Sequence, residues 1–440
     1  MKSTLTFFMI ILALAITATA NAEAVSPIDL ALARQYFDDL KNTSDTDAGK
    51  LWGVRLYGPT FFVDPDSRFM VANQADKDGR LKAEDGVFIG TLEPSVNIAN
   101  SSLEWSGTDW TIVNWNSLSP TDPYDRMRLL VHESWHRVQD EIGFPSATSS
   151  NVYLDDKDGR IYLLLEFRAL SKALMAKDSS TQAEAIGDAL TFRMYRQSLH
   201  PGNNENAFER HEGMAEYTGL KLCGLPDSLL CIIAAKKLQL GEQSSGLANS
   251  FAYLTGPALG LLLDRLSPGW RIKVREGVDL PDLLASSINW KKPDNAQQLK
   301  AAVDATGGKY NASELFAAES IRSLRQDQAY EAFKDRLQTD GRLIIPNNNL
   351  KFGFNPDENL VAFDTTGVIY KTLRLSGDFG ILEADSGIVR ENNWQYFMAV
   401  APAPDKIAGD TLVWPGYRLI LNPGWKIELK KPRIYIIANK

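Results

Sequence analysis

Apolar residues recur at helical spacing over most of the central part of the chain. Residues 23–43 are expected to form a helix, because an apolar face repeats there with a period near 3.6 residues. That face consists of Leu30, Ala33, Tyr36, Phe37 and Leu40. The same pattern predicts helices over 123–142, 160–176, 181–198, 206–219, 253–266 and 312–323, with more helical segments up to about residue 337.

Two regions instead alternate short apolar runs with Gly, Pro, Asn and Asp, which is typical of strands and turns. In residues 52–116 the expected strands fall within Trp52–Phe62, Val87–Leu92 and Trp110–Trp115. From Arg342 onward they are Leu343–Ile345, Val368–Leu375, Trp394–Val400, Tyr417–Leu421 and Ile434–Ile437. The predicted fold class is α+β, with an N-terminal α/β region (23–120), a mainly helical domain (121–338) and a β-rich C-terminal domain (339–440).

Residues 1–22 have the pattern of a secretory signal peptide. Lys2 supplies the positive start, Phe7–Ala18 the apolar core and Ala20–Ala22 the small-residue cleavage site. That core is shorter than the roughly 20 residues that span a bilayer, and no later run is long enough. We therefore expect a secreted or periplasmic protein with no stable membrane span after signal cleavage.

The composition favours a globular enzyme and disfavours a nucleic-acid partner. The 440 residues are 44% hydrophobic and 10% aromatic, enough to bury the cores of two or three domains. The formal net charge is -8 and no basic tract occurs. Nucleic-acid binding relies on Lys and Arg against phosphate, so this class is disfavoured.

The two cysteines, Cys223 and Cys231, are close in sequence. In an exported protein such a pair favours a disulfide. Buried unpaired thiols are the alternative, whereas a structural zinc site would need four ligands.

The segment His132–His136 carries the strongest chemical signal. Residues four apart lie on the same face of a helix, so His132 and His136 can bind one Zn²⁺ ion at roughly 2.0–2.1 Å. Glu133 then lies beside the metal, where it can act as the general base that takes a proton from the attacking water. The chain has only 4 histidines in 440 residues. The alternative is a pair of ordinary surface or core histidines.

The helix that carries this segment has clear boundaries. Asp122 is a favourable N-cap and Pro123 suits the first helical position, while Gly143 and Pro145 favour an end after residue 142. Apolar residues recur between them, so we expect a largely buried helix.

A catalytic zinc site usually has three protein ligands, so a third must come from elsewhere. Glu212 is the favoured donor, within a helix expected over residues 206–219. Glu209 and His211 are the competing candidates. Glu216 follows Glu212 by one helical turn, where it can hydrogen-bond a ligating histidine and fix its tautomer.

The segments His132–His136 and Glu212–Tyr217 together resemble those of the gluzincin metallopeptidases, especially the aminopeptidase N branch. The second helix of that branch carries an Asn-Glu-Gly-Phe-Ala motif with the third zinc ligand, so the resemblance implies Glu212 as the ligand. His211 replaces the usual Asn. Tyr253–Gly256 resembles the Tyr-x-Lys-Gly segment, which implies that the Tyr253 hydroxyl stabilises the oxyanion. A core tyrosine is the alternative.

Two features depart from that branch. The chain has no Gly-x-Met-x-Asn element, which binds the free amino end of the substrate in aminopeptidases. The spacing between His136 and Glu212 is also longer, so residues 146–205 should form an insertion or a different helical layout. The pattern of both helices also resembles uncharacterised secreted bacterial proteins.

In gluzincins the edge strand of a sheet beside the active-site helix binds substrate. The resemblance assigns this role to Thr111–Trp115, and an ordinary core strand is the alternative.

Two charged residues, Glu166 and Arg168, interrupt the apolar run Leu163–Leu170. A charge there costs free energy unless it is paired or hydrated. A structural ion pair or an exposed helix face is favoured over a role beside the metal.

These patterns predict a secreted zinc metallopeptidase with one Zn²⁺ per chain and a peptide or protein substrate. A zinc amidase acting on a non-protein amide is one alternative. The other is an exported protein that binds a partner through its C-terminal β-rich domain, with a structural or vestigial metal site.

Overall fold

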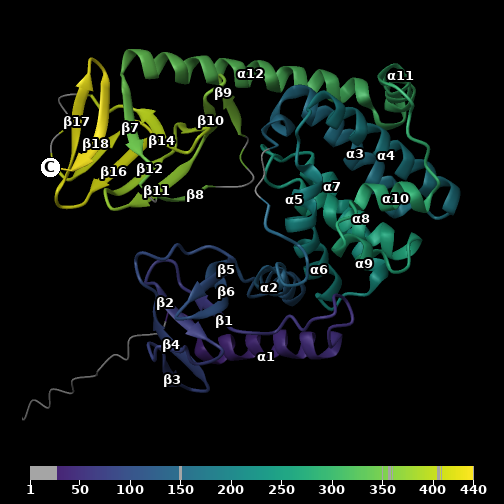
Figure 1. The fold of residues 1–440 in the computed structure, drawn as a ribbon, viewed down its shortest axis with the longest axis horizontal. Helices are drawn as coiled ribbons and strands as arrows, with labels where there is room; N and C mark the ends of the chain where they lie inside the picture. The colour runs from purple at the N-terminus through teal and green to yellow at the C-terminus, as the bar shows by residue number, and fades with distance from the viewer. Residues whose placement is uncertain are drawn as a thin grey trace, which may run out of the picture.

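The computed structural model describes residues 27–147, 151–348, 350–354, 358, 360–403, 407 and 409–439. The predicted signal peptide, residues 1–22, lies outside these residues. The fold is α+β, as predicted, with an N-terminal sheet region, a helical middle and a β-rich C-terminal domain (Figure 1). Among the described residues, no helix has the combined length and apolar character needed to cross a bilayer.

The N-terminal region consists of helix α1 (Leu30–Asp47) and a six-stranded sheet of order β3-β4-β2-β1-β6-β5. The strands are β1 (Thr60–Val63), β2 (Phe69–Ala72), β3 (Lys82–Glu84), β4 (Val87–Thr91), β5 (Ser101–Trp105) and β6 (Thr108–Asn114). Strands β1 and β6 run parallel, and the other neighbours are antiparallel. The apolar face expected for α1 is buried at Ala33, Tyr36, Phe37 and Leu40 and partly buried at Leu30.

The position of β6 corrects the prediction for Thr111–Trp115. Strand β6 lies between β1 and β5, so it is not an edge strand; β5 is. Ser106 and Gly107 connect β5 to β6 with positive φ angles of 50° and 66°, which is the backbone of a tight hairpin turn. This turn folds β5 back along β6 and covers the edge that β6 would otherwise expose.

The helical domain contains the segment His132–His136, which lies in its first helix. Its helices are α2 (Pro123–Val138), α3 (Lys157–Met175), α4 (Ser179–Leu199), α5 (Glu205–Phe208), α6 (Met214–Leu222), α7 (Asp227–Gly241), α8 (Ala252–Leu266), α9 (Trp270–Arg275), α10 (Leu280–Ser287), α11 (Ala296–Gly307) and α12 (Ala312–Thr339). The π-helical segment Glu209–Gly213 joins α5 to α6. Helices α3 and α4 pack together and account for most of the predicted insertion.

The C-terminal domain contains two sheets. One has the order β17-β18-β7-β14-β13-β10-β9 and the other β15-β16-β12-β11-β8. The strands are β7 (Arg342–Pro346), β8 (Lys351–Gly353), β9 (Val361–Phe363), β10 (Gly367–Tyr370), β11 (Leu373–Gly377), β12 (Gly380–Ala384), β13 (Ile388–Glu391), β14 (Tyr396–Val400), β15 (Thr411–Trp414), β16 (Tyr417–Leu421), β17 (Trp425–Lys431) and β18 (Ile434–Asn439). The run expected as one strand, Val368–Leu375, forms parts of β10 and β11 in different sheets.

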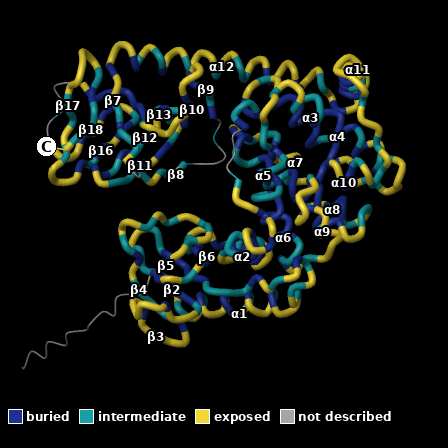
Figure 2. Tube along the Cα trace, viewed as in Figure 1, coloured by how far each residue is buried: buried dark blue, intermediate teal, exposed yellow. Residues whose placement is uncertain are grey.

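The apolar cores do not follow all the predicted boundaries. One core extends from α1 and one face of the N-terminal sheet into the helices, across the boundary placed at residue 120. A second core fills the C-terminal domain, where Figure 2 shows buried segments within the strands. This core also includes Ala248 from the helical domain. The Asp155 carboxylate also links these two domains, because it accepts the backbone N–H groups of Leu247 and Leu360 at 2.6 and 2.9 Å.

Candidate metal centre

Helix α2 presents both predicted histidines on one face. Its N-cap is Asp122, whose side chain accepts the backbone N–H groups of Tyr124 and Asp125, and Pro123 opens the helix as expected. The helix ends at Val138 rather than near Gly143. His132 and Glu133 are buried, and the ring of His136 is partly exposed.

Three donor atoms from two distant segments of the chain lie close together. His132 Nε2 is 3.1 Å from His136 Nε2, and Glu212 Oε2 is 3.5 and 3.4 Å from these two atoms. When four atoms bind zinc in a tetrahedral arrangement, any two of these ligand atoms are roughly 3.3–3.4 Å apart. The spacing of this donor set, His132, His136 and Glu212, therefore fits a single Zn²⁺ ion.

Close backbone packing positions Glu212. It lies in the π-helical segment Glu209–Gly213, which packs against α8. A Cβ atom on Gly256 would lie 2.3 Å from Gly213 Cα, so a larger residue there would force the two segments apart. Gly256 therefore allows α8 to approach this segment closely.

Glu216 orients His132. Its Oε2 atom lies 3.1 Å from His132 Nδ1 and accepts a hydrogen bond from Arg128 at 2.7 Å, while its Oε1 atom accepts one from Lys237 at 2.8 Å. Burial opposes ionisation, but Lys237, His132 and Arg128 hold the pKa of Glu216 well below its usual range. The ionised carboxylate favours a proton on Nδ1, which leaves the Nε2 lone pair of His132 free to bind a metal.

Gln139 contacts the Nδ1 atom of His136, as Glu216 contacts that of His132. Its Oε1 atom lies 3.0 Å from His136 Nδ1, so the amide oxygen can accept the imidazole proton. Gln139, Arg128 and Lys237 are not among the residues predicted from the sequence. Gln139 and Arg128 could have been found from helical spacing, since they lie three residues after His136 and four before His132. Nothing in the local sequence points to Lys237, because it comes from α7.

Glu133 faces a cavity of about 1230 Å³ that is also lined by His132 and Tyr253. Its Oε2 atom is buried and has no hydrogen-bond partner among the described residues. Burial raises the pKa of Glu133. An unpaired carboxylate of raised pKa beside the donor set is suited to accept a proton.

Tyr253 lies directly on the donor set. Its hydroxyl donates a hydrogen bond of 2.6 Å to Glu212 Oε2, and its ring stacks on that of His132 with centroids 5.5 Å apart. Burial, and then the charge of Glu212, raise the pKa of Tyr253, so the hydroxyl remains a donor. It is within reach of the donor set, and in this structure its hydrogen-bond partner is Glu212.

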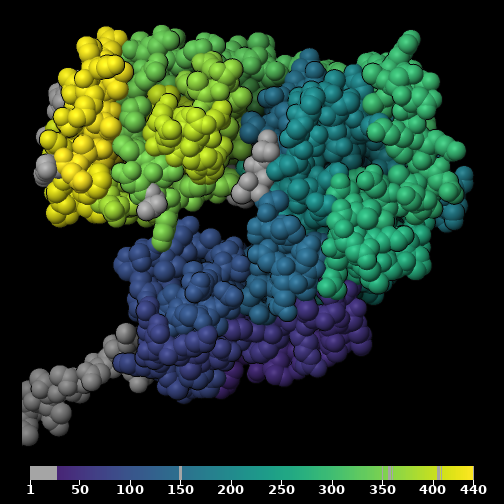
Figure 3. Space-filling model, viewed as in Figure 1, coloured from purple at the N-terminus to yellow at the C-terminus, as the bar shows by residue number. Residues whose placement is uncertain are grey.

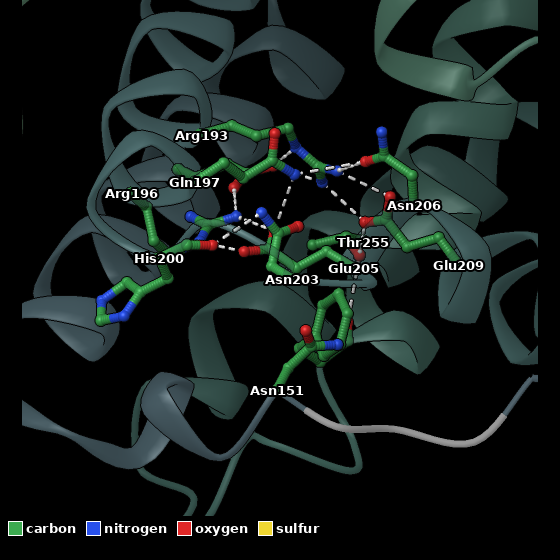
Figure 4. A network of polar contacts seen from close by, with 12 residues as sticks. Asn151, Arg193, Arg196, Gln197, His200, Asn203, Glu205, Asn206, Glu209 and Thr255 are labelled. Atoms are coloured by element: carbon green, nitrogen blue, oxygen red, sulfur yellow. Dashed lines mark hydrogen bonds and ion pairs between the residues drawn. The ribbon is translucent and has the colours of Figure 1, made fainter.

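The competing ligand Glu209 has other partners. It is fully buried, and Arg193 donates to both of its oxygens, at 2.7 and 2.6 Å. Arg193 also pairs with Glu166, and Arg196 pairs with Glu166 and Glu205. Figure 4 shows the part of this network that contains Arg193, Arg196, Glu205 and Glu209. This network of two arginines and three glutamates holds the segment that carries Glu212.

Two further predicted residues are accounted for by ion pairs or backbone contacts. Arg168 pairs with Glu242 at 2.7 Å, which agrees with the expected ion pair. His211, the other competing ligand, has its Nδ1 atom 2.9 Å from the backbone oxygen of Ala147. Its ring remains close to that of His136, with centroids 5.2 Å apart.

The predicted disulfide is absent from this structure. Cys223 and Cys231 are separate buried thiols. Cys223 follows the end of α6 and Cys231 lies within α7, where Arg265 donates a hydrogen bond of 3.0 Å to its sulfur. Nearness in sequence therefore does not make these two side chains face each other.

Comparisons with known proteins find no match to a protein-family model, to a curated protein or to a solved structure. The chemistry of this site must therefore be argued from its own residues.

Proposed function

We propose that this protein is a zinc-dependent metallopeptidase that is exported from the cell. The observation that carries the proposal is the triangle of donor atoms from His132, His136 and Glu212, with edges of 3.1, 3.4 and 3.5 Å. Two imidazoles and one carboxylate are a donor set typical of catalytic zinc sites. When bound there, Zn²⁺ would supply Lewis acidity to polarise the scissile carbonyl group and activate water.

The surrounding residues would then act on the reacting groups. Glu133 would accept the proton of the attacking water and pass it to the departing amine. Glu216 and Gln139 would hold the two imidazoles in the required tautomers. Tyr253 would turn its hydroxyl from Glu212 towards the oxyanion that develops on the carbonyl oxygen.

The test begins with the metal content of the protein from residue 23 onward, purified without added metal or chelator. We expect about one zinc per chain, and loss of that zinc in Glu212→Ala. Glu133→Gln should retain zinc but lose hydrolysis of a peptide library, because Glu133 is not a ligand. Glu141→Gln is the matched control, since Glu141 is an exposed glutamate just after α2.

Absence of zinc after reconstitution would refute the metal site. Zinc binding without hydrolysis of any peptide in the library would refute the peptidase proposal. A Glu133→Gln protein that hydrolyses peptides like the wild type would refute the assignment of the general base.

A further inference from the structure

The C-terminal domain forms one wall of the cavity at the candidate metal centre. Phe354, Glu358 and Lys371 line the same space of about 1230 Å³ as His132 and Glu133. The contacts of Asp155 with Leu247 and Leu360 hold the two domains together beside this space. A ligand bound at the metal centre would therefore meet side chains of both domains.

A second cavity continues from the first. It has a volume of about 900 Å³ and shares Ala99 and Phe354 with the cavity at the metal centre. Arg68 and Asn97 line it on the N-terminal side, and Arg374 on the C-terminal side. Figure 3 shows a hollow between the N-terminal region and the C-terminal domain. We call these two joined cavities the interdomain groove.

The size of the interdomain groove favours a polymeric ligand. Pockets that enclose a small molecule have volumes of roughly 300–1,000 Å³. One part of the groove exceeds this range and the other lies near its top. A chain in extended conformation, which advances about 3.3 Å per residue, can occupy both parts at once.

The C-terminal wall offers contacts that suit an extended polypeptide. Strand β8 is the last strand of its sheet, so its outer edge has no strand partner among the described residues. Phe352 and Phe354 are half-buried there with ring centroids 6.0 Å apart. A sheet edge can bind main-chain groups, and partly exposed aromatic rings can bind apolar side chains of many kinds.

Lys371 adds a charge to this wall. Its side chain is exposed, and no carboxylate lies within ion-pair distance of it among the residues that the structure describes. Glu358, on the same wall, already accepts hydrogen bonds from the backbone and side chain of Thr372. Lys371 is therefore available to bind an acidic side chain of the ligand.

We propose that the substrate is an extended polypeptide segment that occupies the whole interdomain groove, with the C-terminal domain binding the part remote from the scissile bond. This inference rests on the proposed function. Phe352, Phe354 and Lys371 are then specificity-determining residues. The enzyme cleaves within long unfolded segments, and short peptides lack the contacts with the C-terminal domain.

The experiment measures kcat/KM for peptides that share one cleavage site and are lengthened on either side, from about four to about twelve residues. We expect kcat/KM to rise at least about 10-fold with length on one side. Phe354→Ala should remove most of that gain, so the ratio of kcat/KM between the longest and the shortest peptide should fall towards one. Val413→Ala is the matched control, because Val413 is exposed on β15 at the opposite edge of the same sheet.

A second variant does not depend on the packing of an aromatic residue. Lys371 is exposed, so Lys371→Glu should fold normally, and it should reverse a preference for acidic over basic residues in the distal part of long peptides. Equal kcat/KM at all lengths, together with unchanged preference in Lys371→Glu, would overturn the inference while leaving the peptidase intact.

A binding measurement separates this inference from the proposed function. Zinc-loaded Glu133→Gln is titrated against fluorescein-labelled, randomised peptides of about four and twelve residues, with anisotropy as the readout. Tighter binding of the longer peptides, weakened by Phe354→Ala, supports the groove even if no peptide is cleaved. Equal binding of both lengths contradicts it.

Discussion

At the scale of single residues, the donor set depends on neighbours that fix its tautomers. Glu216 contacts His132, Arg128 and Lys237 at once. The candidate residues His132, Glu133, His136, Glu212, Glu216 and Tyr253 were all expected from the sequence, and the structure brings them together. The contribution of Lys237 could not be expected, because it depends on the approach of α7.

Glu216→Gln is predicted to weaken zinc binding by about 10- to 100-fold. The amide would no longer supply the negative charge that favours a proton on His132 Nδ1. Competition with a zinc chelator measures the change. Glu242→Gln is the control, since Glu242 is another carboxylate that pairs with an arginine, although it is less buried than Glu216. Equal zinc affinity in both variants would exclude an orienting role for Glu216.

Tyr253→Phe is predicted to lower kcat by about 10²- to 10³-fold if its hydroxyl stabilises the oxyanion. The zinc content should remain near that of the wild type, because Tyr253 is not in the donor set. Peptide hydrolysis and metal analysis on the same sample test both statements. Unchanged kcat would identify Tyr253 as an ordinary packed tyrosine.

At the scale of secondary-structure elements, the site depends on the π-helical segment Glu209–Gly213. The sequence indicates a helix over 206–219, but helical periodicity does not reveal a π-helical turn within it. The turn is held from one side by the Arg193–Glu209 pair and from the other by the contact of Gly213 with Gly256. Local propensity alone would not select this conformation over a regular helix.

Gly256→Ala is predicted to destabilise the protein by about 1–3 kcal/mol and to weaken zinc binding. The added methyl group would contact backbone atoms of Gly213, which cannot rotate away. Urea unfolding and chelator competition measure the two effects. Gly308→Ala is the matched control, because Gly308 has no neighbour within 4 Å of an added Cβ and a φ of -59°. Its stability should be unchanged or slightly higher.

At the scale of the whole molecule, two apolar cores are joined through a small set of contacts. The candidate ligands belong to elements of the first core, while the C-terminal domain has its own. A ligand that binds only the folded state stabilises the unit that contains its site. Zinc should therefore act differently on the two parts of the protein.

Saturating zinc is predicted to raise the unfolding temperature of the helical domain, with a stabilisation of about 4 kcal/mol at 1,000 times Kd. The transition of the C-terminal core should move much less. Differential scanning calorimetry with and without chelator measures both, with Glu212→Ala as the control that should not respond. A shift of both transitions by the same amount would indicate a single cooperative unit.

The features that could be predicted from the sequence are those that act within one short segment. Helical spacing places His132 and His136 on one face, and Asp122 and Pro123 begin α2, because both effects need only neighbouring residues. Which distant segments meet depends on the tertiary structure. It made β5 the edge strand, kept Cys223 and Cys231 apart, and brought Lys237 and the C-terminal wall to the site. These outcomes depend on packing between distant parts of the chain, on which local patterns carry no information.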